Sequence, residues 1–329
     1  MSIAAPTAHN RPGLGIALIL IGITAISVND MLIKQLSGGY PLHQIVFTRS
    51  AIAILFSLVF VQLEGGWRIL KTDQPLLHTL RGILIVVANL SFFAALAVLP
   101  LGETTALFFA APLFITLLSI PILGEKVGPL RIGAVLVGFL GVLIMQRPWA
   151  GFGDLEVSRV ILLLPVLAAL TYALTQVMTR KLGVTSKASA LAVYIQAMFL
   201  VIGGLFWLVA GDGRYAEGLE NESLIFLLRA WELPMGLDRW FFLGLGFNAA
   251  IIGYCLSAAY READAATVAP FEYVGLPLAV FWGWVVWGDL PDFAVSLGIA
   301  LIMGAGLFVF LRERAKKRPI ASRRINRRY

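Results

Sequence analysis

The chain has 329 residues, of which 59% are hydrophobic and 14% charged, and its formal net charge is +7. Soluble domains carry about 25% charged residues, so this composition excludes an ordinary soluble protein and indicates a chain that lies in the lipid bilayer. Nine of the 26 Lys and Arg residues lie between Arg312 and the C-terminus, which indicates a cytoplasmic anchor on acidic lipids rather than a nucleic-acid site. The single cysteine, Cys255, excludes an intramolecular disulfide.

Ten apolar stretches fill the chain almost from end to end, and a transmembrane helix needs about 20 such residues. The first stretch has no convincing cleavage site, so we expect a retained helix rather than a removed signal peptide. Pro100 and Gly102 mark the turn between the third and fourth stretches. The expected spans are 13–34, 42–63, 79–99, 102–123, 129–146, 159–180, 188–210, 239–260, 266–288 and 293–311.

Positive charge is retained on the cytoplasmic side of membrane proteins, and this rule orients the spans. With the N-terminus inside, 19 Lys and Arg residues fall on the cytoplasmic side and 6 outside. We therefore expect a multi-pass protein of the inner cell membrane with both termini in the cytoplasm. The long connection 211–238 is then outside, and its segment NESLIFLLRAWELPM is apolar enough to lie on the membrane surface or to cover a cavity mouth. A plain loop is an equal alternative.

The last two spans of the first half resemble the last two spans of the second half. Gly124 and Glu125 end the fourth span as Gly288 and Asp289 end the ninth, 164 positions later. Five spans in each copy force the second copy to enter the bilayer upside down, which is the architecture of secondary transporters. The predicted division is 1–12, a cytoplasmic segment; 13–148, the first repeat; 149–313, the second repeat with connection 211–238; and 314–329, a basic cytoplasmic tail.

Two long segments carry a family resemblance. LPLGETTALFFAAPLFITLLSIPILGEKVGPLRIGAVLVGFLGVLIMQRP (99–148) and AYREADAATVAPFEYVGLPLAVFWGWVVWGDLPDFAVSLGIALIMGAGLFVFLRE (259–313) resemble the two copies of the EamA domain in the drug/metabolite transporter superfamily. The resemblance implies an all-α fold of ten transmembrane helices in two inverted five-helix repeats around a central cavity. It also implies a transported metabolite, since members of the family export amino acids and drugs or import riboflavin and S-adenosylmethionine.

Ionisable side chains within spans are costly, and each suggests a function. Asp30 lies near the outer end of the first span and Arg49 deeper in the second. Arg49 is predicted to hold a substrate carboxylate or phosphate, with Asp30 as its partner when the site is empty. The alternative is a permanent pair that fixes the two helices together, and the sequence leaves both open.

Glu272, early in the ninth span, is a candidate proton carrier because burial would disfavour its charged form. A helix-end acid wetted by the cytoplasm is the alternative. Gln196 aligns roughly with Arg49 in the second half and is expected to line the same cavity.

Aromatic rings are candidates for contact with a planar ligand, although Phe is common in any span. Those expected to bind substrate are Phe93, Phe109, Tyr260 and Tyr273. Small residues four apart, at Ala134 and Gly138 and at Ala300 and Gly304, would allow close helix packing, including a homodimer.

Phosphate-binding loops, HExxH and GxSxG do not occur, and the three histidines are scattered, so we expect no enzyme activity, cofactor or metal. The sequence predicts a secondary transporter that moves a small organic metabolite by alternating access, with proton coupling inferred only from Glu272 and Asp30. A planar or anionic substrate such as riboflavin is slightly favoured. Amino acids and their derivatives, including S-adenosylmethionine, remain open, and an intramembrane lipid-acting enzyme or a non-transporting receptor is a remote alternative.

Overall fold

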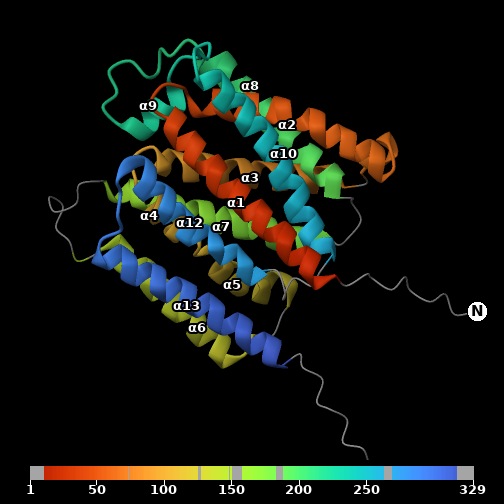
Figure 1. Cartoon of the computed structure of the whole chain (residues 1–329), viewed down its shortest axis with the longest axis vertical. Helices are drawn as coiled ribbons and strands as arrows, with labels where there is room; N and C mark the ends of the chain where they lie inside the picture. The colour runs from red at the N-terminus through yellow and green to blue at the C-terminus, as the bar shows by residue number, and fades with distance from the viewer. Residues whose placement is uncertain are drawn as a thin grey trace, which may run out of the picture.

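The computed structural model of the chain describes residues 11–72, 74–124, 127–147, 149, 158–182, 188–262 and 269–316. Within these residues every regular element is helical, as the sequence predicts (Figure 1). In chain order they are α1 (Pro12–Leu36), α2 (Leu42–Glu64), η1 (Trp67–Leu70), α3 (Pro75–Leu96), α4 (Leu101–Phe108), α5 (Ala111–Leu123), α6 (Pro129–Gln146), α7 (Arg159–Leu182), α8 (Ala188–Ala210), α9 (Glu222–Leu228), α10 (Asp238–Glu262), η2 (Ala269–Val274), α12 (Gly275–Trp282), η3 (Gly283–Trp287) and α13 (Phe293–Lys316).

The expected spans correspond closely to these helices. In the part of the chain that is described, nine helices are long and apolar enough to cross a membrane, and the segment Phe271–Trp287 is a shorter apolar tenth. The spans expected at 129–146 and 188–210 coincide with α6 and α8. The ten-span fold class is therefore confirmed, and the first residues of the expected ninth span, 266–268, lie outside the described residues.

Two spans expected as continuous helices are broken. The fourth consists of α4 and α5, separated by Phe109 and Ala110. Pro112 explains this break, because a proline has no backbone N–H and clashes with the preceding turn, and it is tolerated at the start of a helix. The ninth span joins the 3₁₀ turn η2, the α-helix α12 and the π turn η3. Tyr273, at the junction of η2 and α12, lies 164 positions after Phe109.

The repeat is also visible in the ends of these spans. Gly124 and Gly288, the residues that the sequence pairs, both follow their helices in the left-handed conformation, with φ of 70° and 75°. This conformation suits glycine because it has no Cβ to clash with the backbone. The same kind of helix end therefore occurs 164 positions apart.

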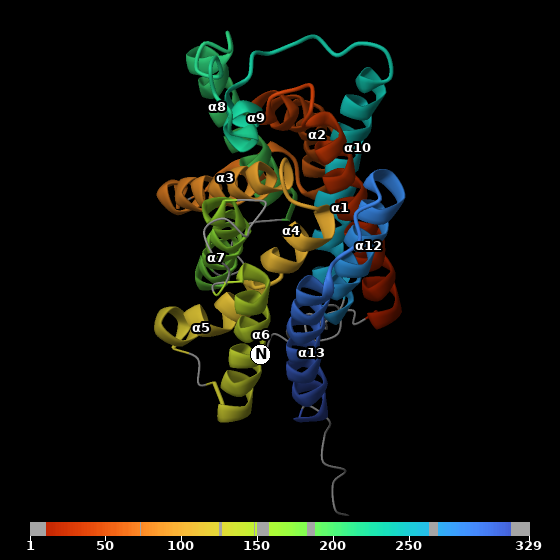
Figure 2. The ribbon, with the colours of Figure 1, turned by 90° about the vertical axis from the view of Figure 1, so that its left-hand side faces the viewer.

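The two halves of the chain interlock. The most extensive helix contacts are α1 with α10, α6 with α13, α3 with α7 and α2 with α8, and each joins an element before residue 148 to one after it (Figures 1 and 2). The repeat makes α7 the counterpart of α1 and α10 the counterpart of α3. The contact of α1 with α10 is then the counterpart of the contact of α7 with α3, as two-fold-related halves require. Repeat boundaries at 148 and 313 stay a prediction.

Glycine allows the backbones of α6 and α13 to approach closely. A Cβ on Gly141 of α6 would lie 2.9 Å from the carbonyl oxygen of Gly298 in α13. The small residues Ala134 and Gly138 are buried within the chain, and a Cβ on Gly138 would meet Leu113. The α6 face is thus occupied internally, whereas Gly304 on α13 has nothing within 4 Å of an added Cβ.

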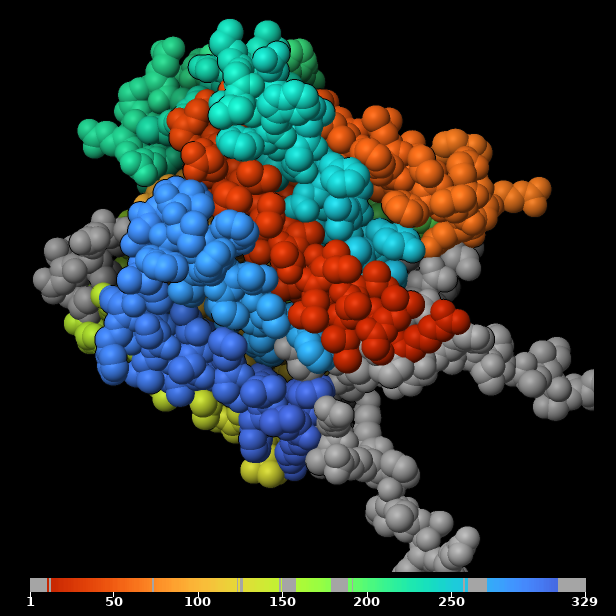
Figure 3. Space-filling view, viewed as in Figure 1, coloured from red at the N-terminus to blue at the C-terminus, as the bar shows by residue number. Residues whose placement is uncertain are grey.

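The bundle has two distinct ends. In Figure 1 α1 begins and α13 ends on the right, whereas α9 lies on the left. The space-filling view shows α1 and α10 side by side between these ends, with α12 and α13 next to them (Figure 3). We call the two ends the termini side and the α9 side. The termini leave the described bundle on one side, and a cytoplasmic position for that side stays a prediction.

The connection between α8 and α10 is packed against the bundle. Ser223 Oγ donates a hydrogen bond of 2.7 Å to the Ala94 carbonyl of α3, and Phe226 is fully buried. Gln44 of α2 exchanges two hydrogen bonds with the backbone of Glu232. Of the three alternatives left open by the sequence, the geometry favours a cover over the ends of α2 and α3 on the α9 side.

Candidate functional site

A buried guanidinium lies where α1, α2, α3 and α8 meet. Arg49 Nη1 donates to Asn29 Oδ1 at 3.3 Å, and its Nη2 donates to Asn89 Oδ1 at 3.5 Å. The guanidinium carbon also lies 5.6 Å from the ring centroid of Phe199. Two amides and an aromatic face therefore surround a cation within the bilayer, where unpaired charge is costly.

Asp30 reaches this cluster indirectly. Asn29 Nδ2 donates to Asp30 Oδ1 at 3.0 Å, while the oxygen of the same amide accepts from Arg49. Among the described residues, Asp30 and Arg49 make no direct hydrogen bond or ion pair. The Asn29 amide therefore links the two charged side chains, and the predicted roles of Asp30 and Arg49 in substrate binding stay a prediction.

Other polar contacts connect α1 to the second half. Trp282 Nε1 of α12 donates to Ser27 Oγ at 3.2 Å, and Asn248 of α10 donates to the Ala25 carbonyl. These bonds lie within two turns of Asn29 on α1. Elements of both halves therefore converge on the middle of this helix, where discontinuous spans and the repeat architecture place a transport site.

Aromatic rings form two groups beside this cluster. Phe93, Phe92, Phe108 and Tyr172 make a chain of ring contacts with centroids 5.1, 5.3 and 5.4 Å apart. Phe109 and Tyr273, the residues at the two span breaks, contact each other at 5.4 Å. The residues 164 positions apart thus meet across the two halves.

The remaining predicted site residues are less closely connected. Glu272 lies in η2 and directly precedes Tyr273 of the second aromatic group. Gln196 has a buried Oε1 that accepts no hydrogen bond from any described residue. The side chain of Tyr260 lies outside the described side chains. Direct substrate contact by any of these residues is untested.

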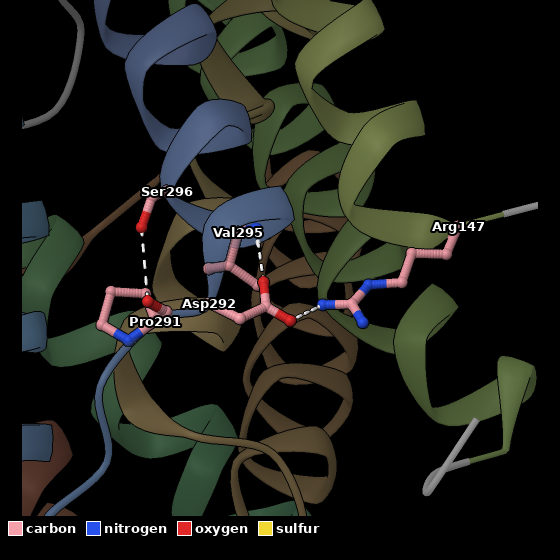
Figure 4. A network of polar contacts seen from close by, with 5 residues as sticks. All are labelled: Arg147, Pro291, Asp292, Val295 and Ser296. Atoms are coloured by element: carbon pink, nitrogen blue, oxygen red, sulfur yellow. Dashed lines mark hydrogen bonds and ion pairs between the residues drawn. The ribbon is translucent and has the colours of Figure 1, made fainter. Parts of the chain in front are cut away.

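A separate polar network joins α6 to α13, away from the cluster (Figure 4). Arg147, at the end of α6, donates to Asp292 Oδ2, and Asp292 Oδ1 accepts from the Val295 N–H at 2.9 Å as an N-terminal cap of α13. Partial burial alone would raise the pKa of Asp292, but the bonds from Val295 and Arg147 hold it below its usual value. The network holds the two helices together, and we interpret it as a structural contact rather than as part of a transport site.

Comparison with known proteins decides the family. The pattern of the EamA-like transporter family matches residues 13–147. A riboflavin transporter of Rhizobium johnstonii is 32% identical over 92% of this chain and 93% of its own length. The chain belongs to the EamA-like transporter family. Members of this family are transporters, so the predicted transport class is confirmed and an enzyme is not supported.

Other relatives are named for riboflavin or for S-adenosylmethionine. A riboflavin transporter of Vibrio cholerae is also 32% identical, over 92% of this EamA-family chain and 94% of its own length. An S-adenosylmethionine uptake transporter of Rickettsia prowazekii is 25% identical, over 91% and 93%. A solved crystal structure matches with a TM-score of 0.59 at 20% identity, over 92% of this chain and 99% of the other, and supports the fold.

The sequence did not single out Asn29 and Asn89, although both contact Arg49. Neutral amides carry no charge signal and are tolerated in spans. The position of Asn29 offers a weak clue, because it directly precedes Asp30 in an otherwise apolar stretch. Asn89 offers none until α3 is placed beside α2.

Proposed function

We propose that this EamA-family chain carries riboflavin across the inner cell membrane by alternating access of its two halves. The observation that carries the proposal is the ranking of its relatives. Two proteins named riboflavin transporters are each 32% identical over more than nine-tenths of both chains, whereas one named for S-adenosylmethionine uptake is 25% identical.

The polar cluster suits one end of this substrate. The pyrimidine edge of a flavin presents two carbonyl acceptors and one N–H donor. Arg49 supplies donors, and the amides of Asn29 and Asn89 supply both donors and acceptors. Hydrogen bonds from a guanidinium to an acceptor in a water-poor site are stronger than neutral ones, so they would orient that edge.

The aromatic groups suit the rest of the ring system. A tricyclic planar ligand needs apolar or aromatic faces, and the rings of Phe93 and Phe109 belong to the two groups described above. S-adenosylmethionine differs because it carries a sulfonium, an ammonium and a carboxylate, with a net positive charge. A buried Arg49 would attract the carboxylate but repel both cationic groups, whereas the neutral flavin meets no such repulsion.

Coupling to protons is the finer part of the proposal. Glu272 directly precedes Tyr273, whose ring contacts Phe109 of the first half, and Asp30 is linked to Arg49 through one amide. A carboxyl that alternates between protonated and ionised forms in each cycle would couple substrate movement to a proton gradient. We assign this role to Glu272.

The deciding experiment measures uptake of labelled riboflavin into proteoliposomes that contain the purified chain. We expect uptake that excess unlabelled riboflavin inhibits and that S-adenosylmethionine does not inhibit. Arg49→Lys keeps the charge but loses the fork of donors, so uptake should fall about tenfold or more at equal amounts of folded protein. Arg214→Lys, at an exposed arginine, is the matched control and should transport normally. Uptake of S-adenosylmethionine without riboflavin would overturn the assignment.

A further inference from the structure

Arg81 is a second buried guanidinium, and the proposed transport site does not use it. It lies in the second turn of α3 and is 7% exposed, the same as Arg49. Within the described ranges, no acceptor lies at hydrogen-bond or ion-pair distance from its guanidinium, and its Nε is fully buried. The helix that carries it, Pro75–Leu96, contains no acidic residue.

Other arginines of the chain show what Arg81 lacks. Arg49 donates to two amides, Arg147 to a carboxylate and Arg229 to the backbone carbonyls of Ser37 and Gly38. Leaving a buried cation without such acceptors costs several kcal/mol in general. A nearly buried guanidinium with no acceptor from the described residues within hydrogen-bond distance is suited to an external anion.

The surroundings of Arg81 come from both halves. His78 lies one helical turn before it, and the His78 ring is 4.8 Å from the ring of Tyr194 in α8. Tyr194 Oη donates to the Leu70 carbonyl of η1 at 2.5 Å, so the loop between α2 and α3 is attached to α8 here. A Cβ on Gly82 would come within 3.0 Å of Met198, which shows how closely α3 and α8 pack beside the guanidinium.

This position is distinct from the Arg49 cluster. Asn89, which binds Arg49, lies eight residues after Arg81 on α3, about 12 Å farther along the helix axis. The helix begins at Pro75, and α2 ends on the termini side of the bundle (Figure 1). Arg81 therefore lies between the termini side and the proposed transport site.

We propose that Arg81 forms an oxyanion-binding site that takes a phosphate group from the termini side. The planar fork of a guanidinium matches two oxygens of one phosphate, which gives both charge and direction. His78 lies one helical turn before Arg81 on α3 and contacts the ring of Tyr194 in α8, so residues of both halves lie in the neighbourhood of this fork.

The phosphate comes from one of two sources, inorganic phosphate or a phosphate ester. Riboflavin has no anionic group, so its phosphate ester is the form of this substrate that offers an oxyanion to the Arg81 fork. Its formation requires a kinase that transfers the terminal phosphoryl group of ATP to the ribityl hydroxyl and releases ADP and a proton. Binding of that ester at Arg81 would slow further uptake as the product accumulates. Only this last step rests on the proposed riboflavin transport.

The test measures thermal unfolding of the full-length protein in lipid nanodiscs, with phosphate replacing chloride at constant ionic strength. We expect phosphate to raise the apparent Tm of the wild type in a saturable manner. Arg81→Gln should weaken the apparent affinity about tenfold or more, and Arg81→Lys should weaken it severalfold because the fork is lost. Arg214→Lys, at an exposed arginine outside both sites, should keep the response.

Two results would overturn the site: no response of the wild type to phosphate beyond that to chloride, or an unchanged affinity in both Arg81 variants. If Arg81→Gln does not fold, an unchanged affinity in Arg81→Lys alone is sufficient to reject it. Riboflavin 5′-phosphate is titrated in parallel. If the ester saturates the Tm shift at lower concentrations than inorganic phosphate does, the ester is assigned as the ligand. If both saturate it at equal concentrations, the free anion is assigned. No transport enters these measurements, so their failure leaves the riboflavin proposal to its own test.

Discussion

The amide of Asn29 is the point at which the polar cluster is most sensitive to mutation. It is buried, it accepts from the charged Arg49 and it donates to Asp30. Asn29→Leu preserves the approximate shape of the side chain and removes both bonds. Asn89→Leu removes one longer bond to the same guanidinium and one neutral bond, from Asn89 Nδ2 to the Ile85 carbonyl.

The contacts set the expected order of the two effects. A hydrogen bond to a charged group contributes about 1.5–3 kcal/mol, so the two bonds of Asn29 are worth about 3–6 kcal/mol. The bond of Asn89 to Arg49, at 3.5 Å, belongs at the lower end, and with the neutral bond to Ile85 the two are worth about 2–3 kcal/mol. Asn29→Leu should therefore lower the apparent Tm in nanodiscs more than Asn89→Leu does.

The control is Thr24→Val on the same helix. Thr24 is exposed, and its hydroxyl donates only to the carbonyl of Leu20, so the apparent Tm should change little. Equal effects of the two asparagine variants, or a larger effect of Asn89→Leu, would refute the role of Asn29 as the bridge. Purified protein of each variant is compared at the same pH and lipid composition.

Three further predictions concern topology, coupling and acid stability. Reporters fused after Tyr329 and near Lys71 should both report cytoplasm, and one near Gly218 should report the outside; a C-terminal reporter outside the cell would contradict the charge bias. Glu272→Gln should abolish accumulation driven by a pH gradient while exchange of substrate persists, and normal accumulation in the variant would remove the coupling role. Because its pKa is lowered, Asp292 contributes stability above its usual pKa of 3.8 and loses it as pH falls through the lowered value. Asp292→Asn should thus lower the apparent Tm at pH 6, with a difference that shrinks toward pH 3, and a constant difference would contradict the ion pair.

The sequence predicts the spans well because each needs only length and apolar composition. It misses the interruptions at Phe109 and in η2, since hydropathy is unaffected by a local change from α to 3₁₀ or π geometry. Pro112 and Gly275 are the signals that were available. Proline inside an apolar run is nonetheless ambiguous, because α5 and α7 also contain Pro121 and Pro165 without ending there.

The candidate site is predictable in part for a related reason. Arg49, Asp30 and Glu272 stand out because charge is rare in membrane spans. Their partners are neutral, and only the packing of α1, α2 and α3 brings Asn29 and Asn89 to the guanidinium. Arg81 escapes notice since it is close to the end of a span, where arginine commonly reaches the headgroups.

The interlocked halves have a consequence for how the chain is made. Elements of the first half find their main partners in the second, as α1 does in α10 and α6 in α13. At about 5–20 residues per second, roughly 10–30 s of synthesis separate equivalent points of the two halves. During that time the surfaces of the first five spans that will contact the second half face lipid or one another. Neither half is therefore a folding unit, and a gene split between α6 and α7 should yield functional protein only when both fragments are synthesised together.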